Sequence, residues 1–159
     1  MQALQISAVV CAFISLLLLL IALGSDYWLA NASGHIGLWK ACAKVLAIYT
    51  CRSIGMDVKD FIHVTRAFMF FGMIAGAISC IGLCGTFFSV QFGSISKAKT
   101  AAIASIVAAL CVMIAMAVYT GETGGKASYG WSFGFGWVSF PFFLVTGGLA
   151  FRLNAAATE

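Results

Sequence analysis

Charged side chains are scarce in this sequence of 159 residues, because Asp, Glu, Lys and Arg together make up only 9% of it. Apolar residues make up 62%. A soluble domain is about 25% charged and about 45–50% apolar. Since so few charges cannot cover so apolar a core in water, the composition excludes an ordinary soluble domain and favours a lipid bilayer as the solvent.

Four long stretches contain no Asp, Glu, Lys or Arg: residues 1–25, 67–96, 100–121 and 127–151. A helix needs roughly 20 apolar residues to cross the hydrocarbon, so each stretch can hold one span and none can hold two. We therefore predict one membrane domain over residues 1–159, with spans near 4–24, 64–90, 101–120 and 133–153. Loops 26–63 and 121–132 would lie on one side of the membrane, and loop 91–100 and both termini on the other.

Signals for cleavage, catalysis, metal binding and nucleic-acid binding are missing as well. Residues 1–5 carry no basic side chain, which disfavours a cleaved signal peptide. The spans have no acid or base in their central portions, which argues against a transporter or a channel within one bundle. His35 and His63 are the only histidines and lack the spaced partners of a zinc site. Asp57 and Asp60 have no nearby nucleophile, so helix capping is their expected role.

The net charge of +4 is spread over both sides of the predicted membrane domain. It therefore does not indicate a nucleic-acid partner. We expect no enzymatic activity, no cofactor and no metal, and we expect membrane lipids and other membrane proteins, including copies of this chain, as partners.

Two chemical signals in the 26–63 loop bear on its orientation. Cys42 and Cys51 are the only cysteines outside the predicted spans, and their spacing suits a bridge across a hairpin, which requires an oxidising compartment. Asn31-Ala32-Ser33 is a glycosylation sequon, which is read only on the lumenal side. Together these signals place the loop outside and both termini in the cytosol, although the count of Lys and Arg does not decide the orientation.

The same loop is expected to form strands. Residues 26–30, 37–43 and 45–52 are rich in aromatic, apolar and β-branched side chains, which favour a pleated surface. Gly34 and residues 43–44 would be turns. Since so short a loop cannot build an adequate core alone, it would depend on the disulfide and on the membrane surface beneath it.

The order of certain residues in this loop is specific. Trp28 is followed by Gly37-Leu38-Trp39, then by Cys42 and Cys51. This order resembles the signature of the claudin superfamily, which includes the peripheral myelin and epithelial membrane proteins. Residues 65–69, 117–120, 131–133 and 136–138 extend the resemblance along the whole chain, toward the family branches of the lens fibre membrane intrinsic protein and of the natural killer cell granule protein.

The resemblance implies an all-α membrane fold, a left-handed four-transmembrane-helix bundle with a small extracellular antiparallel β-sheet. The first loop would supply four strands and residues 129–133 a fifth. Trp28 and Trp39 would pack against the top of the bundle, or else form an interfacial aromatic belt. Arg66 would join the loop to the bundle through hydrogen bonds, or else extend to the lipid headgroups. The family implies no enzymatic activity.

Other residues have two interpretations each. Cys84 and Cys80, one turn apart near the cytosolic end of a span, are candidates for palmitoylation or simple packing residues. Gly72 and Gly76 suit close helix packing, within the bundle or between two copies. Apolar Leu46 and Ile48 lie in the expected hairpin and are candidate contact residues.

The favoured function is a structural protein that mediates cell–cell or lateral membrane contacts through its first extracellular loop at the plasma membrane. The alternative is an accessory or trafficking protein of granule or endosomal membranes. A paracellular channel is less favoured, because the second loop is short and the tail ends at Ala157-Thr158-Glu159 rather than in an apolar residue.

Overall fold

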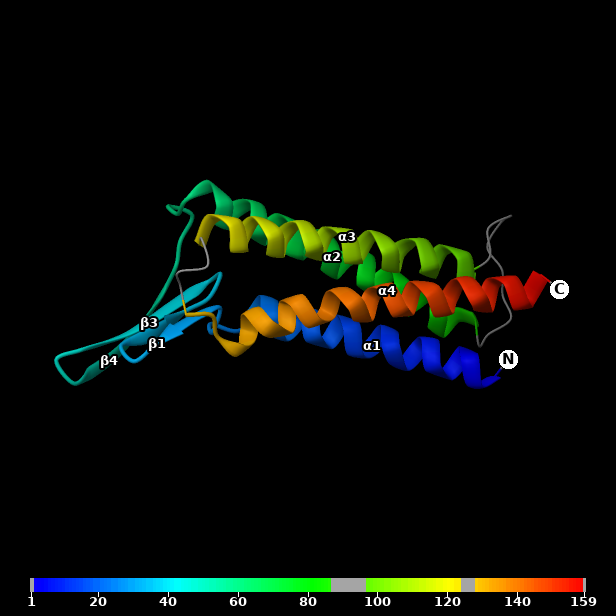
Figure 1. Cartoon of the computed structure of the whole chain (residues 1–159), viewed down its shortest axis with the longest axis horizontal. Coiled ribbons are helices and arrows are strands. Elements are labelled where there is room, and N and C mark those ends of the chain that lie inside the picture. The colour runs from blue at the N-terminus through cyan, green and yellow to red at the C-terminus, as the bar shows by residue number, and fades with distance from the viewer. Residues whose placement is uncertain (1, 87–96, 124–127, 159) are drawn as a thin grey trace.

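The computed structural model describes residues 2–86, 97–123 and 128–158. Its four long helices are α1 (Gln2–Gly24), α2 (Asp60–Gly85), α3 (Lys97–Thr123) and α4 (Trp131–Thr158). They lie side by side, and α1 begins at the same end of the bundle at which α4 ends (Figure 1). A small sheet lies beyond the other end, which we call the sheet end. All four helices are long and apolar enough to cross a membrane.

The helices extend beyond the apolar stretches that predicted them. Helix α2 begins at Asp60, four residues before the predicted start, and α4 continues to Thr158 instead of 153. The predicted end of the second span, 87–90, lies outside the described residues. Hydropathy marks the hydrocarbon-crossing part of a helix, whereas backbone hydrogen bonding can continue past it: α3 begins at the charged Lys97, which donates to the Gly85 carbonyl (3.2 Å).

The expected helix capping by aspartate is only partly found. Lys59 is the N-cap of α2 and makes no side-chain capping hydrogen bond, so Asp57 does not cap this helix. Asp60 lies in the first turn, where a negative charge is favoured by the helix dipole.

The sheet has four antiparallel strands in the order β1 (Leu29–Asn31), β2 (Gly34–Ile36), β3 (Lys40–Val45) and β4 (Ile48–Ser53). The turn predicted at 43–44 is wrong. The β3–β4 turn lies at Leu46 and Ala47, which both have positive φ, 52° and 69°. Two-residue turns of that conformation match the twist of the flanking strands. They usually contain Asn or Gly, and neither residue is present in this turn. Residues 37–39 are not strand but connect β2 to β3.

The predicted fifth strand is also wrong as a strand. Only Tyr129 pairs with the sheet, through an isolated bridge to Leu29, and α4 already begins at Trp131. Two backbone hydrogen bonds flank the bridge, from Ala30 N to Ser128 O (2.8 Å) and from Gly130 N to Trp28 O (3.0 Å). Residues 131–133, which were predicted to be part of the strand, form the first turn of α4 instead.

The helices pack closely through small side chains. One core cluster lies toward the sheet end and includes Trp28, Leu38 and Tyr119, and a second consists largely of alanines. Gly72 faces Val112 of α3, and a β-carbon on Gly76 would lie within 3.0 Å of Phe143. Both glycines are buried. They therefore serve packing within the chain rather than a contact between two copies.

Hydroxyl groups join the helices inside the bundle. The Ser79 and Ser105 hydroxyls are 2.6 Å apart, and Ser79 also donates to the Ala101 carbonyl (3.0 Å). Ser15 and Thr146 pair at 3.3 Å between α1 and α4. Within the described parts of the chain, no buried side-chain nitrogen or oxygen lacks a hydrogen-bond partner. The predicted fold class, a four-helix membrane bundle carrying a small antiparallel sheet, is confirmed.

Candidate functional site

Trp28 fixes the sheet to the end of α1. The indole is fully buried, and its Nε1–H donates to the carbonyl of Ala22 at 2.6 Å. That carbonyl belongs to the last turn of α1, whose carbonyls have no partner within the helix. The ring packs edge-to-face against Tyr119 of α3, with centroids 4.8 Å apart. One side chain thus completes a helix end and anchors the chain where it enters β1.

Gly37 and Leu38 bring the β2–β3 connection down onto the bundle. A β-carbon at Gly37 would lie 2.5 Å from both the Asp26 Cα and the Ser25 carbonyl oxygen, so only glycine permits this approach of two backbones. The next side chain, Leu38, is fully buried in the core cluster near the sheet. Gly37 therefore allows the close backbone contact, and Leu38 fills space in the core beneath it.

Arg66 holds the same connection from α2. Its Nε and Nη2 both donate to the Leu38 carbonyl (2.9 and 2.6 Å), and Nη1 donates to the Gly55 carbonyl (3.3 Å). The guanidinium lies 4.4 Å from the centroid of the Trp39 ring, a cation–π distance. The residue is only 4% exposed, and no described carboxylate forms an ion pair with it. Carbonyl oxygens and a π face replace water around this cation. We call Trp28, Gly37, Leu38, Trp39 and Arg66 the junction.

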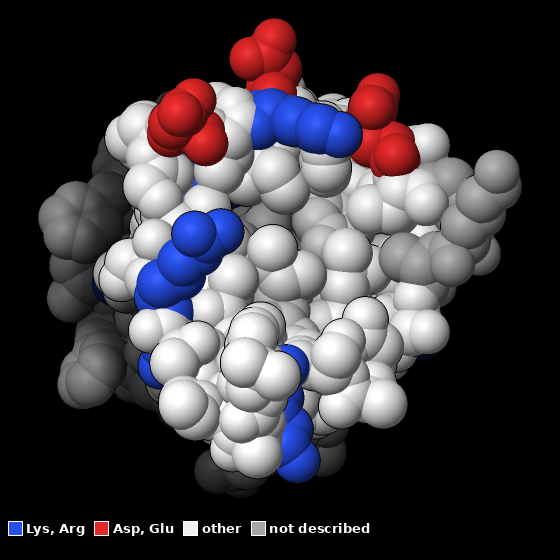
Figure 2. Space-filling model, turned by 90° about the vertical axis from the view of Figure 1, so that its left-hand side faces the viewer, with Lys and Arg blue, Asp and Glu red and all other residues white. Residues whose placement is uncertain are grey.

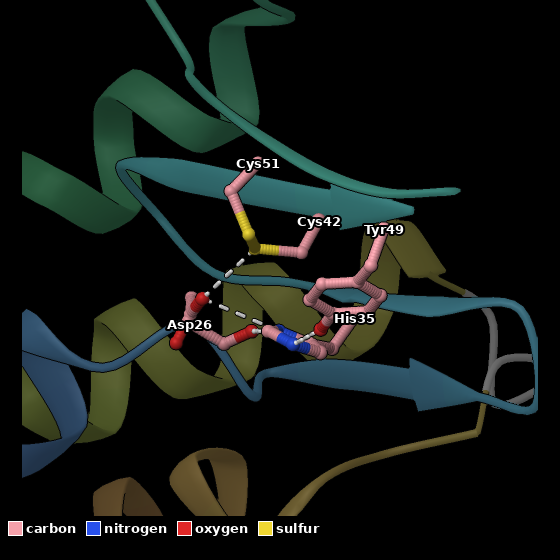
Figure 3. The surroundings of a disulfide bond; sticks show 5 residues. All are labelled: Asp26, His35, Cys42, Tyr49 and Cys51. Atoms are coloured by element: carbon pink, nitrogen blue, oxygen red, sulfur yellow. Dashed lines mark hydrogen bonds and ion pairs between the residues drawn. A yellow bond between two sulfur atoms is a disulfide. The ribbon is translucent and has the colours of Figure 1, made fainter. Parts of the chain in front are cut away.

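The predicted disulfide is present between Cys42 of β3 and Cys51 of β4 (Figure 3). The two cysteines are directly paired in the strand register, so the bridge closes the hairpin across its middle. The Cys42 sulfur lies 3.5 Å from the Asp26 carboxylate. Because a disulfide sulfur carries no proton, this is a contact and not a hydrogen bond.

A polar chain that the sequence did not reveal runs beside the disulfide (Figure 3). His35 Nδ1 lies 2.9 Å from the Asp26 carbonyl oxygen and 3.3 Å from its carboxylate, and His35 Nε2 bonds the Tyr49 hydroxyl. Loss of hydration, with smaller effects from Tyr27 and Asp26, raises the pKa of Tyr49 above its ordinary value. The phenol therefore stays protonated at neutral pH. The His35 ring also stacks on the Tyr27 ring, with centroids 3.8 Å apart.

Asp26, His35 and Cys42 lie close enough together to resemble a metal site, since their candidate ligand atoms are within 4.8 Å of one another. The Cys42 sulfur is bonded to Cys51, however, and only a thiolate is a metal ligand. The cluster is consequently a structural support for the hairpin.

The β3–β4 turn is the most exposed apolar feature beyond the helices. Leu46 is 93% exposed and Ile48 65% exposed, and their neighbours Val45 and Tyr49 are exposed too. Figure 1 shows this turn as the part of the sheet farthest from the helices. We call Val45, Leu46, Ala47 and Ile48 the hairpin tip.

The modification candidates occupy different environments. Asn31 is exposed, and its Oδ1 accepts hydrogen bonds from the Ser33 backbone N–H (2.9 Å) and hydroxyl (2.7 Å). Cys80 is 6% exposed inside the second core cluster, which leaves its thiol out of reach of an acyl donor. Cys84 is half-buried near the end of α2, so it is the better placed candidate for palmitoylation.

Comparison with known proteins agrees with this architecture. The chain is 31% identical over 160 residues to Protein NKG7 from Bos taurus, which covers 90% of this chain and 87% of that protein. It is 29% identical over 141 residues to the lens fiber membrane intrinsic protein from Homo sapiens, with 81% and 79% covered. It is 25% identical over 149 residues to claudin domain-containing protein 2 from Mus musculus, with 92% and 84% covered.

A family model described as the PMP-22/EMP/MP20/Claudin family matches residues 1–150, which include the sheet, the junction and most of the four helices. Of the signature residues, Trp28 and Gly37-Leu38-Trp39 join the sheet to the bundle, and Cys42 and Cys51 close the hairpin. The chain is therefore a multi-pass membrane protein that belongs to the PMP-22/EMP/MP20/Claudin family.

Proposed function

We propose that this protein has no enzymatic activity and mediates contacts between facing membranes through its 26–63 loop. The observation that carries the proposal is the hairpin tip, an apolar turn with Leu46 93% exposed on a disulfide-closed hairpin. An exposed apolar patch on a small sheet marks an interaction site. The junction holds the base of the sheet against the helices, so the tip is presented in a fixed direction.

For this function the sheet end faces the outside of the cell, and α1 begins and α4 ends in the cytosol. The Cys42–Cys51 bridge supports that orientation, because such a bond persists in an oxidising compartment. The exposed sequon at Asn31 supports it independently. In the same orientation the half-buried Cys84 lies toward the cytosol, where palmitoylation occurs.

The Asn31 sequon gives a direct test of the orientation. We expect glycosidase treatment of protein from cells to reduce its apparent mass on a gel, and Asn31→Gln to abolish that shift. The control is an epitope tag at the same turn, which should be labelled on intact cells. A tag that is reached only after permeabilisation of cells with surface-delivered protein would contradict the orientation.

The hairpin tip gives the test of function. We expect the double substitution Leu46→Ser and Ile48→Ser to leave surface delivery unchanged and to abolish aggregation of cells that express the protein. Met56→Ser is the matched control, because Met56 is 75% exposed in the same loop but lies outside the tip. Aggregation that persists in the tip variant would show that the contact lies elsewhere.

A second candidate is an accessory protein of granule or endosomal membranes. We keep it because the sequence also resembles the family branch of the natural killer cell granule protein. The sheet would then face the lumen of the organelle. Expressing cells would not aggregate, and most of the protein would be found in intracellular membranes.

A further inference from the structure

The hairpin of β3 and β4 combines apolar and basic side chains and contains no acidic residue. Between residues 40 and 53 the charged residues are Lys40, Lys44 and Arg52. All three are exposed. None of them forms a salt bridge in the part of the chain that the structure describes.

The exposed acidic residues lie away from this hairpin, whereas the partly buried Asp26 lies beside Cys42 of β3. Figure 2 looks onto the sheet end and shows Asp and Glu side chains gathered at its upper edge, whereas only Lys and Arg are seen among uncharged side chains lower down. The exposed acidic residues near this end of the helices are Asp57 just before α2, Asp60 at its start and Glu122 near the end of α3. The exposed charges of the hairpin are therefore all cationic, and the exposed acids of the sheet end lie outside it.

The turn itself presents its apolar side chains in an unfavourable conformation. Leu46 and Ala47 both have left-handed φ, which Asn or Gly would adopt at lower cost. Unfavourable backbone conformations of this kind concentrate at functional sites. Leu46 is exposed at this turn, and the neighbouring Val45, Ile48 and Tyr49 are exposed as well.

On the assumption of the proposed contact function, we propose that the hairpin tip inserts into the surface of a facing lipid bilayer that carries anionic headgroups. The aliphatic tip would enter the headgroup–acyl boundary, where apolar side chains are favoured, and Tyr49 would lie at the level that aromatic residues prefer. Lys44 directly precedes the tip and would reach the headgroups. A cation at an anionic surface strengthens binding by about fivefold.

The other two cations act at longer range. Lys40 and Arg52 lie four to five residues from the tip, about 13–17 Å along the strands. This distance exceeds the Debye length of about 8 Å at physiological salt, so their contribution is smaller and depends more strongly on salt. A second copy fits the tip less well, because a facing copy would present the same basic hairpin, and like charges oppose that contact.

The test uses the full chain in phosphatidylcholine nanodiscs, mixed with protein-free vesicles that can be sedimented. These vesicles contain phosphatidylcholine alone or phosphatidylcholine with phosphatidylserine, and a parallel set of phosphatidylcholine vesicles carries the protein. We expect co-sedimentation with the phosphatidylserine vesicles only, weakened by salt. Lys44→Gln should reduce binding about fivefold, and Leu46→Ser with Ile48→Ser by about tenfold or more. Met56→Ser and Asp57→Asn with Asp60→Asn are the controls and should not weaken binding.

Four outcomes would overturn the proposal. Equal binding to both kinds of vesicle would remove the anionic headgroup as the ligand. Binding only when the vesicles also contain the protein would identify a second copy as the partner, and the contact function would stand without the lipid proposal. Full binding by the tip variant would place the lipid contact on another surface. Cell aggregation that is lost in the tip variant, without any vesicle binding, would also separate the two proposals.

Discussion

Replacing Trp28 with Ala is expected to destabilise the protein by about 3–5 kcal/mol, the cost typical of deleting a buried aromatic side chain. The indole is fully buried, so its loss leaves a cavity between α1 and α3. The Ala22 carbonyl also loses its hydrogen bond from Nε1. We expect a large decrease in the midpoint of thermal unfolding in detergent, together with retention of the variant in the secretory pathway.

Trp131→Ala is the matched control for this prediction. Trp131 is 49% exposed and contacts Tyr27 and Phe135 only through ring packing. We expect Trp131→Ala to cost less stability than Trp28→Ala. In addition to the effect of the buried area that is lost, the lost ring contacts should cost about 1 kcal/mol or less. Equal effects of the two substitutions would mean that Trp28 is an ordinary interfacial aromatic residue and not part of a junction.

Arg66→Met is expected to weaken the attachment of the sheet to the bundle by about 2–5 kcal/mol. The substitution leaves the buried Leu38 carbonyl without a donor, which costs about 1–3 kcal/mol, and removes the cation from the Trp39 ring, worth about 1–2 kcal/mol. Arg66→Lys should recover only part of the stability, because one ammonium group cannot replace a planar fork that donates twice to Leu38 and once to Gly55.

Arg52→Met is the control, because Arg52 is exposed on β4 and the donors to the Leu38 and Gly55 carbonyls come from Arg66. Limited proteolysis of the 26–63 loop in detergent would report the release of the sheet, and unfolding midpoints would report the energy. Replacing a buried charge by an apolar side chain of similar volume is neutral in some proteins. If Arg66→Met unfolds like the wild type, Arg66 is dispensable for attachment of the sheet.

The helices could be predicted from sequence because the physical requirement is strict. Every uncharged stretch had to be about the thickness of a bilayer, and Lys97 and Arg152 marked where such stretches stop. The family signature then indicated which loop residues matter. The signature did not predict which contacts these residues make. Trp28 donates to the Ala22 carbonyl, and a backbone partner cannot be predicted from a pattern of side chains.

The wrong or missing predictions concern features that depend on the three-dimensional structure rather than on local sequence. The turn at Leu46 and Ala47 lacks the residues that normally mark such turns, so a position between Ala43 and Lys44 looked equally good. Residues 129–133 have strand-like composition, yet the bundle takes Trp131 into α4. The His35–Tyr49 bond joins β2 to β4 across an intervening strand, and this pairing depends on a register that is fixed only when the sheet forms.

The junction and the hairpin tip are expected to have different roles, because they make different contacts. The junction residues are buried or packed and contact the helices, whereas the hairpin tip contacts no part of the bundle core. Substitutions in the junction should therefore reduce folding and delivery, and substitutions in the tip should reduce contacts alone. This separation allows loss of contact to be distinguished from loss of protein.

The central claim, that the 26–63 loop mediates contacts between facing membranes, is tested most directly by the distribution of the surface-delivered protein in confluent cells. We expect wild-type protein to be enriched at borders between cells relative to free edges. The variant with Leu46→Ser and Ile48→Ser should reach the surface in equal amount and be evenly distributed. Wild-type protein that reaches the surface but is evenly distributed over borders and free edges would contradict the claim.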